Sequence, residues 1–171
     1  IDYERKKISM YYNNKPGDNR FDPYNSSRKT FYQSRYPYRG SIDQGPNPYV
    51  TNIHEAALRN DTFRTALWTG EHLQLTLMSI NVCDDIGLEM HPDVDQFLRI
   101  EHGQGLVMMG DSKDNLCYQQ RVCEDYVIFV PAGTWHNLIN TGNTPIKLYS
   151  IYAPPNHPHG TVHVTKEDAE H

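Results

Sequence analysis

Two short segments of the sequence carry side chains that commonly bind metal ions. In the first, Glu89 and His91 are two residues apart, and Gln96 follows after a Pro-Asp turn. In the second, His136 comes directly after the turn-forming residues 131–133. Residues i and i+2 of a β-strand lie on the same face, so Glu89 and His91 can point at one place. The spacing predicts that both segments converge on a single metal ion.

The predicted ligands are a carboxylate, an amide oxygen and two imidazoles. Such a set suits one divalent first-row transition metal, and it does not choose among Zn, Mn, Fe and Ni. Because the set contains no thiolate, a structural zinc site is not indicated. Water or substrate would fill the remaining positions, as Lewis-acid chemistry requires. Each residue alone is more often a surface or packing residue, so the prediction depends on their joint spacing.

Short β-strands must position these side chains. After Asn60 the chain alternates short apolar runs with Gly, Pro, Asn or Asp, a pattern typical of an all-β sandwich or barrel. A short helix capped by Thr51 or Asn52 is expected before them, and one helical turn capped by Thr165 after them. The strands are expected within residues 62–70, 72–82, 86–91, 96–103, 104–110, 117–122, 126–131, 135–142 and 145–154.

The two segments resemble the paired motifs of the cupin superfamily. The second motif is matched by Pro131, Gly133, His136 and Asn140, although its leading glycine is absent. The first motif is matched in spacing, with its closing glycine at Gly103 and Cys83 where its leading glycine would fall. The resemblance covers residues of about 60–155. It implies an antiparallel jelly-roll β-barrel and a homodimer or higher homo-oligomer.

Two ligand positions of the first motif are substituted. Glu89 stands at its first histidine position and Gln96 at its glutamate position. The resulting set of two His, one Glu and one Gln is similar to that of the zinc-dependent mannose-6-phosphate isomerases, which are also cupins. The resemblance therefore implies a metal-dependent isomerase acting on a small sugar or sugar phosphate. The chain is much shorter than those enzymes, so the likeness concerns the site.

Two other functions stay open. Glu89, His91 and His136 would also supply the facial triad of a non-haem Fe(II) dioxygenase, with Gln96 as a weak fourth ligand. Alternatively, the protein is not an enzyme, and the metal only stabilises the barrel. In that case the Tyr-rich N-terminal segment would mediate self-assembly or a coat-like association. No catalytic residue and no organic cofactor are predicted.

The chain divides into three parts by composition. Residues 1–48 form a polar extension rich in Tyr, Pro and Arg, residues 49–155 form the barrel, and residues 156–171 form a C-terminal tail. The extension carries a charge of +4 and the remainder −9. A net negative body argues against a nucleic-acid partner, because phosphate binding needs a basic face. The expected ligand is a small polar molecule.

Location is predicted from the cysteines and from apolar runs. Cys83, Cys117 and Cys123 make an odd count without a CxxC pair, which favours free thiols over a Cys117–Cys123 disulfide. No apolar run approaches the length that spans a bilayer, and no signal peptide is visible. We expect a cytoplasmic protein without membrane contact, the alternative being a spore or cell-surface layer.

Several other polar residues are assigned ordinary roles. Arg99 is three residues from Gln96, so it should face outward and is a poor phosphate clamp; Arg35 or Arg39 could fold over the mouth instead. Asn140 is interpreted as a turn residue, and only one of Tyr149 and Tyr152 can face inward. The remaining histidines of the body are expected on the surface or in loops; these are His102, His157, His159 and His163.

Overall fold

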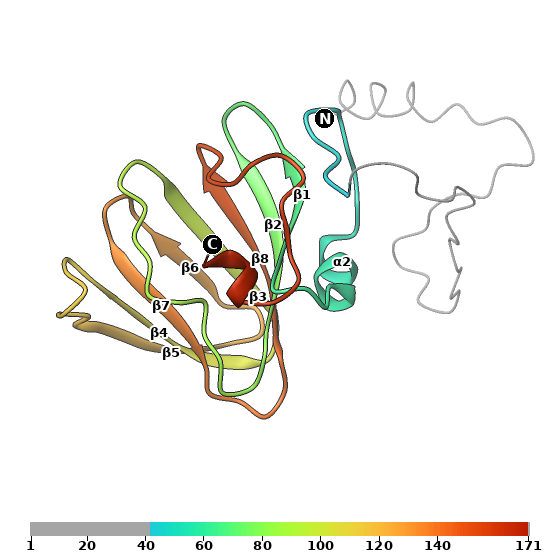
Figure 1. The fold of residues 1–171 in the computed structure, drawn as a ribbon. Helices are drawn as coiled ribbons and strands as arrows, with labels where there is room; N and C mark the ends of the chain where they lie inside the picture. The colour runs from blue at the N-terminus through green and yellow to red at the C-terminus, as the bar shows by residue number, and fades with distance from the viewer. Residues whose placement is uncertain (1–41, 171) are drawn as a thin grey trace, which may run out of the picture. The chain divides into compact units, whose positions relative to one another are not determined.

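The computed structural model describes residues 42–170, which form two antiparallel β-sheets and a short helix (Figure 1). One sheet has six strands in the order β6-β3-β8-β2-β1-β9, and the other has three in the order β5-β4-β7. The strands are β1 (Arg64–Thr69), β2 (Gln74–Ile80), β3 (Asp95–His102), β4 (Gln104–Gly110), β5 (Tyr118–Cys123), β6 (Val127–Val130), β7 (Trp135–Asn140), β8 (Ile146–Ala153) and β9 (Val162–His163).

This arrangement is the all-β jelly roll that the sequence predicts. The two sheets face one another but are not joined by strand pairing into a closed barrel within residues 42–170, so the barrel is open. Most of the predicted extension, including Arg35 and Arg39, lies outside the described residues. The described end of that segment packs on the body, since the buried Asp43 carboxylate accepts hydrogen bonds from Thr69 and from the Gly160 amide.

Helix α2 (Ile53–Arg59) forms where the sequence places it. Asn52 caps it by accepting a hydrogen bond from the Glu55 amide, and Arg59 pairs with Glu55 one turn earlier. The buried Ala57 packs with Leu67 and Leu77 on the outer face of the six-stranded sheet. Helix α2 is too short to cross a membrane, as is η1 (Glu167–Ala169), the other helix of the described residues.

The space between the sheets is filled by alternate residues of the strands. In β8 every second side chain is buried, and the register with β2 and β3 carries the same face across the sheet. The main core cluster is apolar, and it includes Met78, Ile80, Leu98, Ile100, Leu138, Ile146 and Leu148. This cluster occupies one end of the interior and leaves the other end to polar side chains.

Two local predictions were wrong, and one strand was not predicted. Residues 86–91 do not form a strand, because Gly87 has a φ of +87° and only isolated bridges at Asp85 and Glu89 pair this segment with β7. The C-terminal turn is the 3-10 helix η1, and Thr165 does not cap it; the Thr165 amide donates instead to the Asp168 carboxylate. Strand β9 lies within the predicted tail and extends the six-stranded sheet next to β1.

Candidate metal centre

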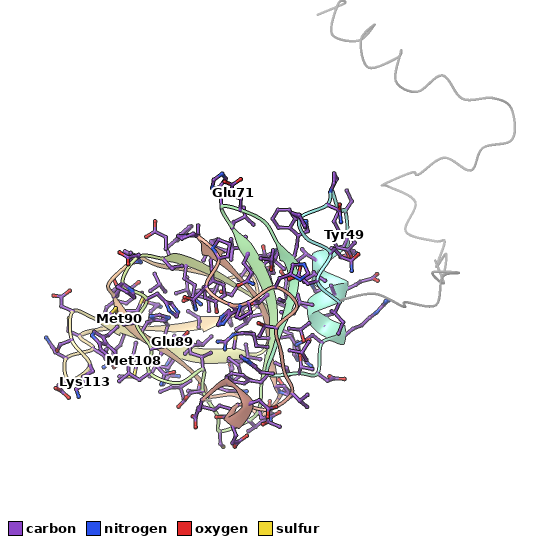
Figure 2. The ribbon with its side chains drawn as sticks, turned by 45° about the horizontal axis from the view of Figure 1, so that its top comes forward. Tyr49, Glu71, Glu89, Met90, Met108 and Lys113 are labelled. Carbon is purple, nitrogen blue, oxygen red and sulfur yellow. The ribbon has the colours of Figure 1, made fainter. Side chains whose placement is uncertain are left out.

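Glu89, His91 and His136 come together at the polar end of the interior. One ligand atom from each lies within 4.8 Å of the other two. The Glu89 Oε1 atom is 3.4 Å from His136 Nε2 and 3.6 Å from His91 Nε2. Figure 2 shows Glu89 within the body of the protein, whereas Glu71 and Lys113 lie at its periphery. The three side chains surround a volume that one metal ion can occupy.

Backbone hydrogen bonds fix the two segments against each other. The Glu89 amide donates to the His136 carbonyl at 3.0 Å, and the His136 amide donates to the Glu89 carbonyl at 2.9 Å. The Gly133 amide donates to the His91 carbonyl at 2.7 Å. A pair of this kind places directly opposite side chains on the same face, so the carboxylate and the imidazole meet without further constraint.

The imidazole of His136 is held in the tautomer that binds metals. Its Nδ1 atom lies 3.0 Å from the Thr134 carbonyl, which can only accept a hydrogen bond. The proton therefore sits on Nδ1, and the Nε2 lone pair faces Glu89. An imidazole oriented by a carbonyl in this way is the usual arrangement around protein-bound metals.

The four predicted ligand atoms share one property. Each is buried and has no hydrogen-bond partner within the described residues; they are Glu89 Oε1, His91 Nε2, His136 Nε2 and Gln96 Oε1. An unpaired buried polar atom costs about 1–3 kcal/mol, so four in one region demand an explanation. A cation held by Glu89, His91 and His136 would satisfy the three of these atoms that lie within 4.8 Å of one another, and this donor set fits a divalent transition metal.

Gln96 lies on the inner face of β3, between Val130 of β6 and Tyr152 of β8. Its side chain is almost fully buried. The Nε2 group donates to the Ser150 hydroxyl at 3.0 Å, and Oε1 has no hydrogen-bond partner among the described residues. That Gln96 supplies an oxygen ligand stays a prediction.

The charge of Glu89 is maintained by its neighbours. Burial alone would raise the pKa of its carboxyl group. The imidazoles of His136 and His91 and the positive charge of Arg64 act in the opposite direction and hold this pKa well below its ordinary value. The carboxylate is therefore ionised at neutral pH and ready to bind a cation.

Polar side chains continue beyond these four residues. The ring of Tyr152, which is fully buried, lies 5.7 Å from that of His91 and 5.0 Å from that of His157. His157 lies in a loop, as expected, but it is partly buried beside the site. His163 is partly buried in β9, so the expectation that it is a surface or loop histidine was wrong. Burial and the positive charge of Arg64 lower the pKa of His157 to about 3, so its imidazole is neutral at pH 7.

Arg64 is the residue that the sequence analysis missed. It is paired with Met78 of β2 and His163 of β9, and only 3% of its surface is exposed. Residues 63–67 are all buried, so the alternation that marks an inward position elsewhere is lost in β1. One feature of the sequence did single it out: Arg64 is the only charged residue of β1.

Other assignments hold in the structure. Tyr152 faces inward and Tyr149 lies on the opposite face, as their parity predicts. Arg99 pairs with Glu101 and Asp125 away from the ligands. Asn140, by contrast, is not a turn residue but the buried last residue of β7. Its oxygen accepts from the Gly142 amide, and its amide group donates to the carbonyls of Ile80 and Thr144. The three cysteines are free and exposed.

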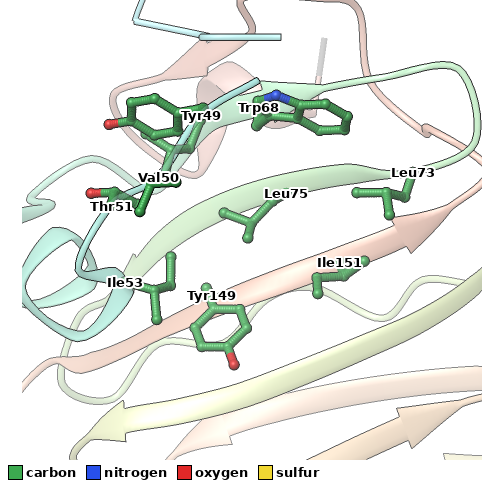
Figure 3. Close-up of a pocket in the computed structure, with 10 residues that line it drawn as sticks. Tyr49, Val50, Thr51, Ile53, Trp68, Leu73, Leu75, Tyr149 and Ile151 are labelled. Atoms are coloured by element: carbon green, nitrogen blue, oxygen red, sulfur yellow. The ribbon is translucent and has the colours of Figure 1, made fainter. Parts of the chain in front are cut away.

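A larger hollow lies elsewhere on the protein. It has a volume of about 520 Å³ and is lined by apolar residues of β1, β2, β8 and the segment before α2, including Tyr49, Leu75 and Ile151 (Figure 3). It lies on the outer face of the sheet and contains none of the predicted ligands. The candidate metal ligands lie instead in the polar region between the sheets.

Comparison with known proteins agrees with this fold. The Cupin domain family model matches residues 76–152. Uncharacterized protein YrkC of Bacillus subtilis (strain 168) is 68% identical over 127 residues, which are 74% of this chain and 68% of that protein. Uncharacterized protein L612 of Acanthamoeba polyphaga mimivirus is 43% identical over 119 residues, which are 69% of this chain and 72% of that protein.

Solved structures show the same similarity. The crystal structure of BH2720 from Bacillus halodurans has 64% sequence identity and a TM-score of 0.75, and the match covers 75% of this chain and 98% of that one. The structure of TT1209 from Thermus thermophilus has a TM-score of 0.53 at 18% identity, covering 61% and 96% of the two chains. The latter likeness concerns the fold alone.

Proposed function

The chain belongs to the cupin family, and we propose that it is a metal-dependent enzyme whose single divalent transition metal is held by Glu89, His91, Gln96 and His136. The observation that carries the proposal is the convergence of the buried, unpartnered ligand atoms of Glu89, His91 and His136 within the described residues. The unpartnered Oε1 atom of Gln96 supports its inclusion as the fourth ligand.

The reaction that we favour is isomerisation of a small sugar or sugar derivative. Such a reaction moves a proton between two adjacent carbons, and a bound metal would polarise the carbonyl oxygen. His157 is a candidate to carry the proton, because its imidazole is neutral and its Nε2 atom is buried without a partner among the described residues. The interior position of the site would exclude bulk water from the substrate.

A non-haem Fe(II) dioxygenase is the second candidate. The observation in its favour is that three ligand atoms from two His and one Glu form a compact group, as in a facial triad. Loading the metal-free protein anaerobically with Fe(II) and then measuring oxygen uptake separates the two reactions. Uptake that depends on substrate favours the dioxygenase, whereas substrate turnover with zinc under nitrogen favours the isomerase.

Elemental analysis of the purified full chain tests the metal centre itself. We expect about one transition metal per chain, and we expect His91→Ala and His136→Ala each to abolish it. His102→Ala is the matched control, because His102 is exposed on β3 and should leave the metal content unchanged. A wild-type protein that is metal-free and cannot be loaded with Zn, Mn, Fe or Ni contradicts the proposal.

The assembly and location remain part of the proposal. We propose a homodimer or higher homo-oligomer in the cytoplasm, as the family resemblance and the free thiols suggest. Light scattering of the full chain and of a chain lacking residues 1–48 tests the first point. A change of oligomer size with unchanged metal content would instead favour the non-enzymatic, self-assembling alternative.

A further inference from the structure

The positive charge of Arg64 lacks a partner in the interior. A guanidinium stays charged in proteins, and burying a charge without a counter-ion is costly. Within residues 42–170 Arg64 forms no ion pair, and its Nε atom is buried without a hydrogen-bond partner. Its contact with the Phe63 ring, 5.4 Å from the ring centroid, supplies only a weak cation–π attraction.

The nearby acidic side chains do not fill this need. Asp43 and Glu101, the acidic residues that are almost fully buried, are engaged elsewhere: Asp43 with Thr69 and backbone amides, Glu101 with His54 and Arg99. The charge of Arg64 lowers the pKa of Glu89, but the Oε1 atom of Glu89 faces the imidazoles of His91 and His136. Arg64 therefore has no ion-pair partner in the part of the chain that the structure describes.

Arg64 and Glu89 line the same cavity. Its volume is about 230 Å³, and its other walls include Phe63, Ile86, Leu88 and Ala169. Tyr152 lies close by: its buried hydroxyl has no hydrogen-bond partner among the described residues, and the charge of Arg64 acts on it. The Arg64 guanidinium lines this space next to Glu89, and the Tyr152 hydroxyl lies near the guanidinium; both groups can donate hydrogen bonds.

Charge balance indicates what would occupy this space. With neutral imidazoles, a metal dication, the Glu89 carboxylate and the Arg64 guanidinium sum to two positive charges in a buried region. A ligand carrying negative charge would compensate them. A guanidinium presents a planar pair of N–H groups that matches a carboxylate. The walls of the cavity are mostly apolar but include Lys166 and Glu170, and its volume suits a small organic molecule.

We propose that Arg64 and Tyr152 form an anion-binding subsite that receives the carboxylate of a small organic acid, while another oxygen of the same molecule faces the metal. This inference rests on the proposed metal centre and specifies its substrate class. Arg64 binds the carboxylate through its N–H groups, and Tyr152 donates from its hydroxyl. Neutral sugars of the same size lack the negative charge that this subsite requires.

Calorimetric titration of the zinc-loaded full chain tests the subsite. The probes are glycerate, its neutral counterpart glycerol, and inorganic phosphate. We expect glycerate to bind at least about tenfold more tightly than glycerol, because one buried charge-assisted hydrogen-bonded pair changes a dissociation constant by about tenfold or more. Arg64→Met should remove this preference and leave zinc content near one per chain, and Arg64→Lys should keep part of it.

Two further variants make the result specific. Arg121→Met removes an exposed arginine of β5 and should change neither glycerate binding nor zinc content. Tyr152→Phe removes only the hydroxyl and should weaken glycerate binding about threefold or more. It also provides the test if Arg64→Met fails to fold.

The possible outcomes separate the two proposals. Failure of the wild type to hold zinc overturns the metal centre, whereas zinc binding without a preference for glycerate overturns the anion subsite alone. Equal glycerate affinity in the wild type, Arg64→Met and Tyr152→Phe also overturns the subsite. Phosphate binding that is tighter than glycerate binding and depends on Arg64 overturns the choice of a carboxylate ligand.

Discussion

The two ends of the interior are built by the same strands and have opposite chemistry. In each of four strands the inward side chains change from apolar to polar, and the changes occur at neighbouring positions of the strands. The changes are from Ile80 and Met78 to Thr76 and Gln74 in β2, from Ile100 and Leu98 to Gln96 in β3, from Leu138 to His136 in β7, and from Ile146 and Leu148 to Ser150 and Tyr152 in β8.

The difference shows how stability and chemistry are divided in this fold. At the apolar end, side chains pack closely, and the buried polar side chain of Asn140 has hydrogen-bond partners. At the polar end, several buried atoms lack partners within residues 42–170, and each such atom lowers stability unless a ligand binds. The apolar end should therefore hold the fold together without ligand, and the polar end should become stable only when occupied.

The largest expected effect comes from opening a hole at the apolar end. Leu148 is fully buried in β8 among the main core cluster. Leu148→Ala should lower the free energy of unfolding by about 3 kcal/mol, because the lost transfer energy is increased by the cavity left behind. Urea denaturation at pH 7 measures the change.

The matched control for Leu148→Ala is Leu73→Ala. Leu73 is 40% exposed just before β2, so its truncation should cost far less. Zinc bound per folded chain should be unchanged in both variants. A cost for Leu148→Ala no greater than that for Leu73→Ala would show that the apolar end does not carry the stability.

An intermediate effect concerns pH and the polar end. The pKa of His157 is about 3 in the folded protein, well below its ordinary value of 6.5. Below about pH 6.5 the His157 imidazole is protonated in the unfolded chain but not in the folded protein. The free energy of unfolding therefore decreases as the pH falls. Between pH 7 and pH 5 this one group should lower the free energy of unfolding by up to about 2 kcal/mol.

His157→Gln isolates this contribution. In metal-free protein, the variant should lose up to about 2 kcal/mol less than the wild type between pH 7 and pH 5. Urea denaturation at both pH values in the presence of a chelator gives the two differences. His102→Gln, at an exposed position, should behave like the wild type. Parallel losses in the wild type and His157→Gln would mean that the His157 imidazole is not shielded from water.

The sequence predicts the fold and the inward direction of His136 because both follow from local rules. Alternation fixes which residues of β7 and β8 face inward, and the turn at residues 131–133 begins β7. The position of the first motif's leading glycine is similarly informative. Cys83, which stands there, has a φ of +64°, so the backbone keeps the glycine-like conformation without the glycine.

The neighbours of the ligands could not be predicted in this way. Arg64 lies in a run where every residue is buried, so parity gives no direction, and its proximity to Glu89 depends on how segment 86–91 crosses the sheet. His157 and His163 face the site because the C-terminal segment adds β9 to the edge of the sheet. That pairing joins residues about 100 positions apart, and no local pattern specifies it.

The smallest expected effect is a gain in stability from a polar residue. Thr76 is fully buried on β2, opposite Ala66 and Ser150, and its hydroxyl has no partner among the described residues. Thr76→Val keeps the shape and removes the unpaired group, so it should raise the free energy of unfolding by about 1 kcal/mol. Thr65→Val is the matched control: the Thr65 hydroxyl is hydrogen-bonded to that of Thr62, and the loss of this bond should lower the free energy of unfolding by a similar amount.

If both variants are destabilised equally in urea denaturation, the Thr76 hydroxyl has a partner such as ordered water. The polar end would then be hydrated in the ligand-free protein, and ligand binding would have to displace that water.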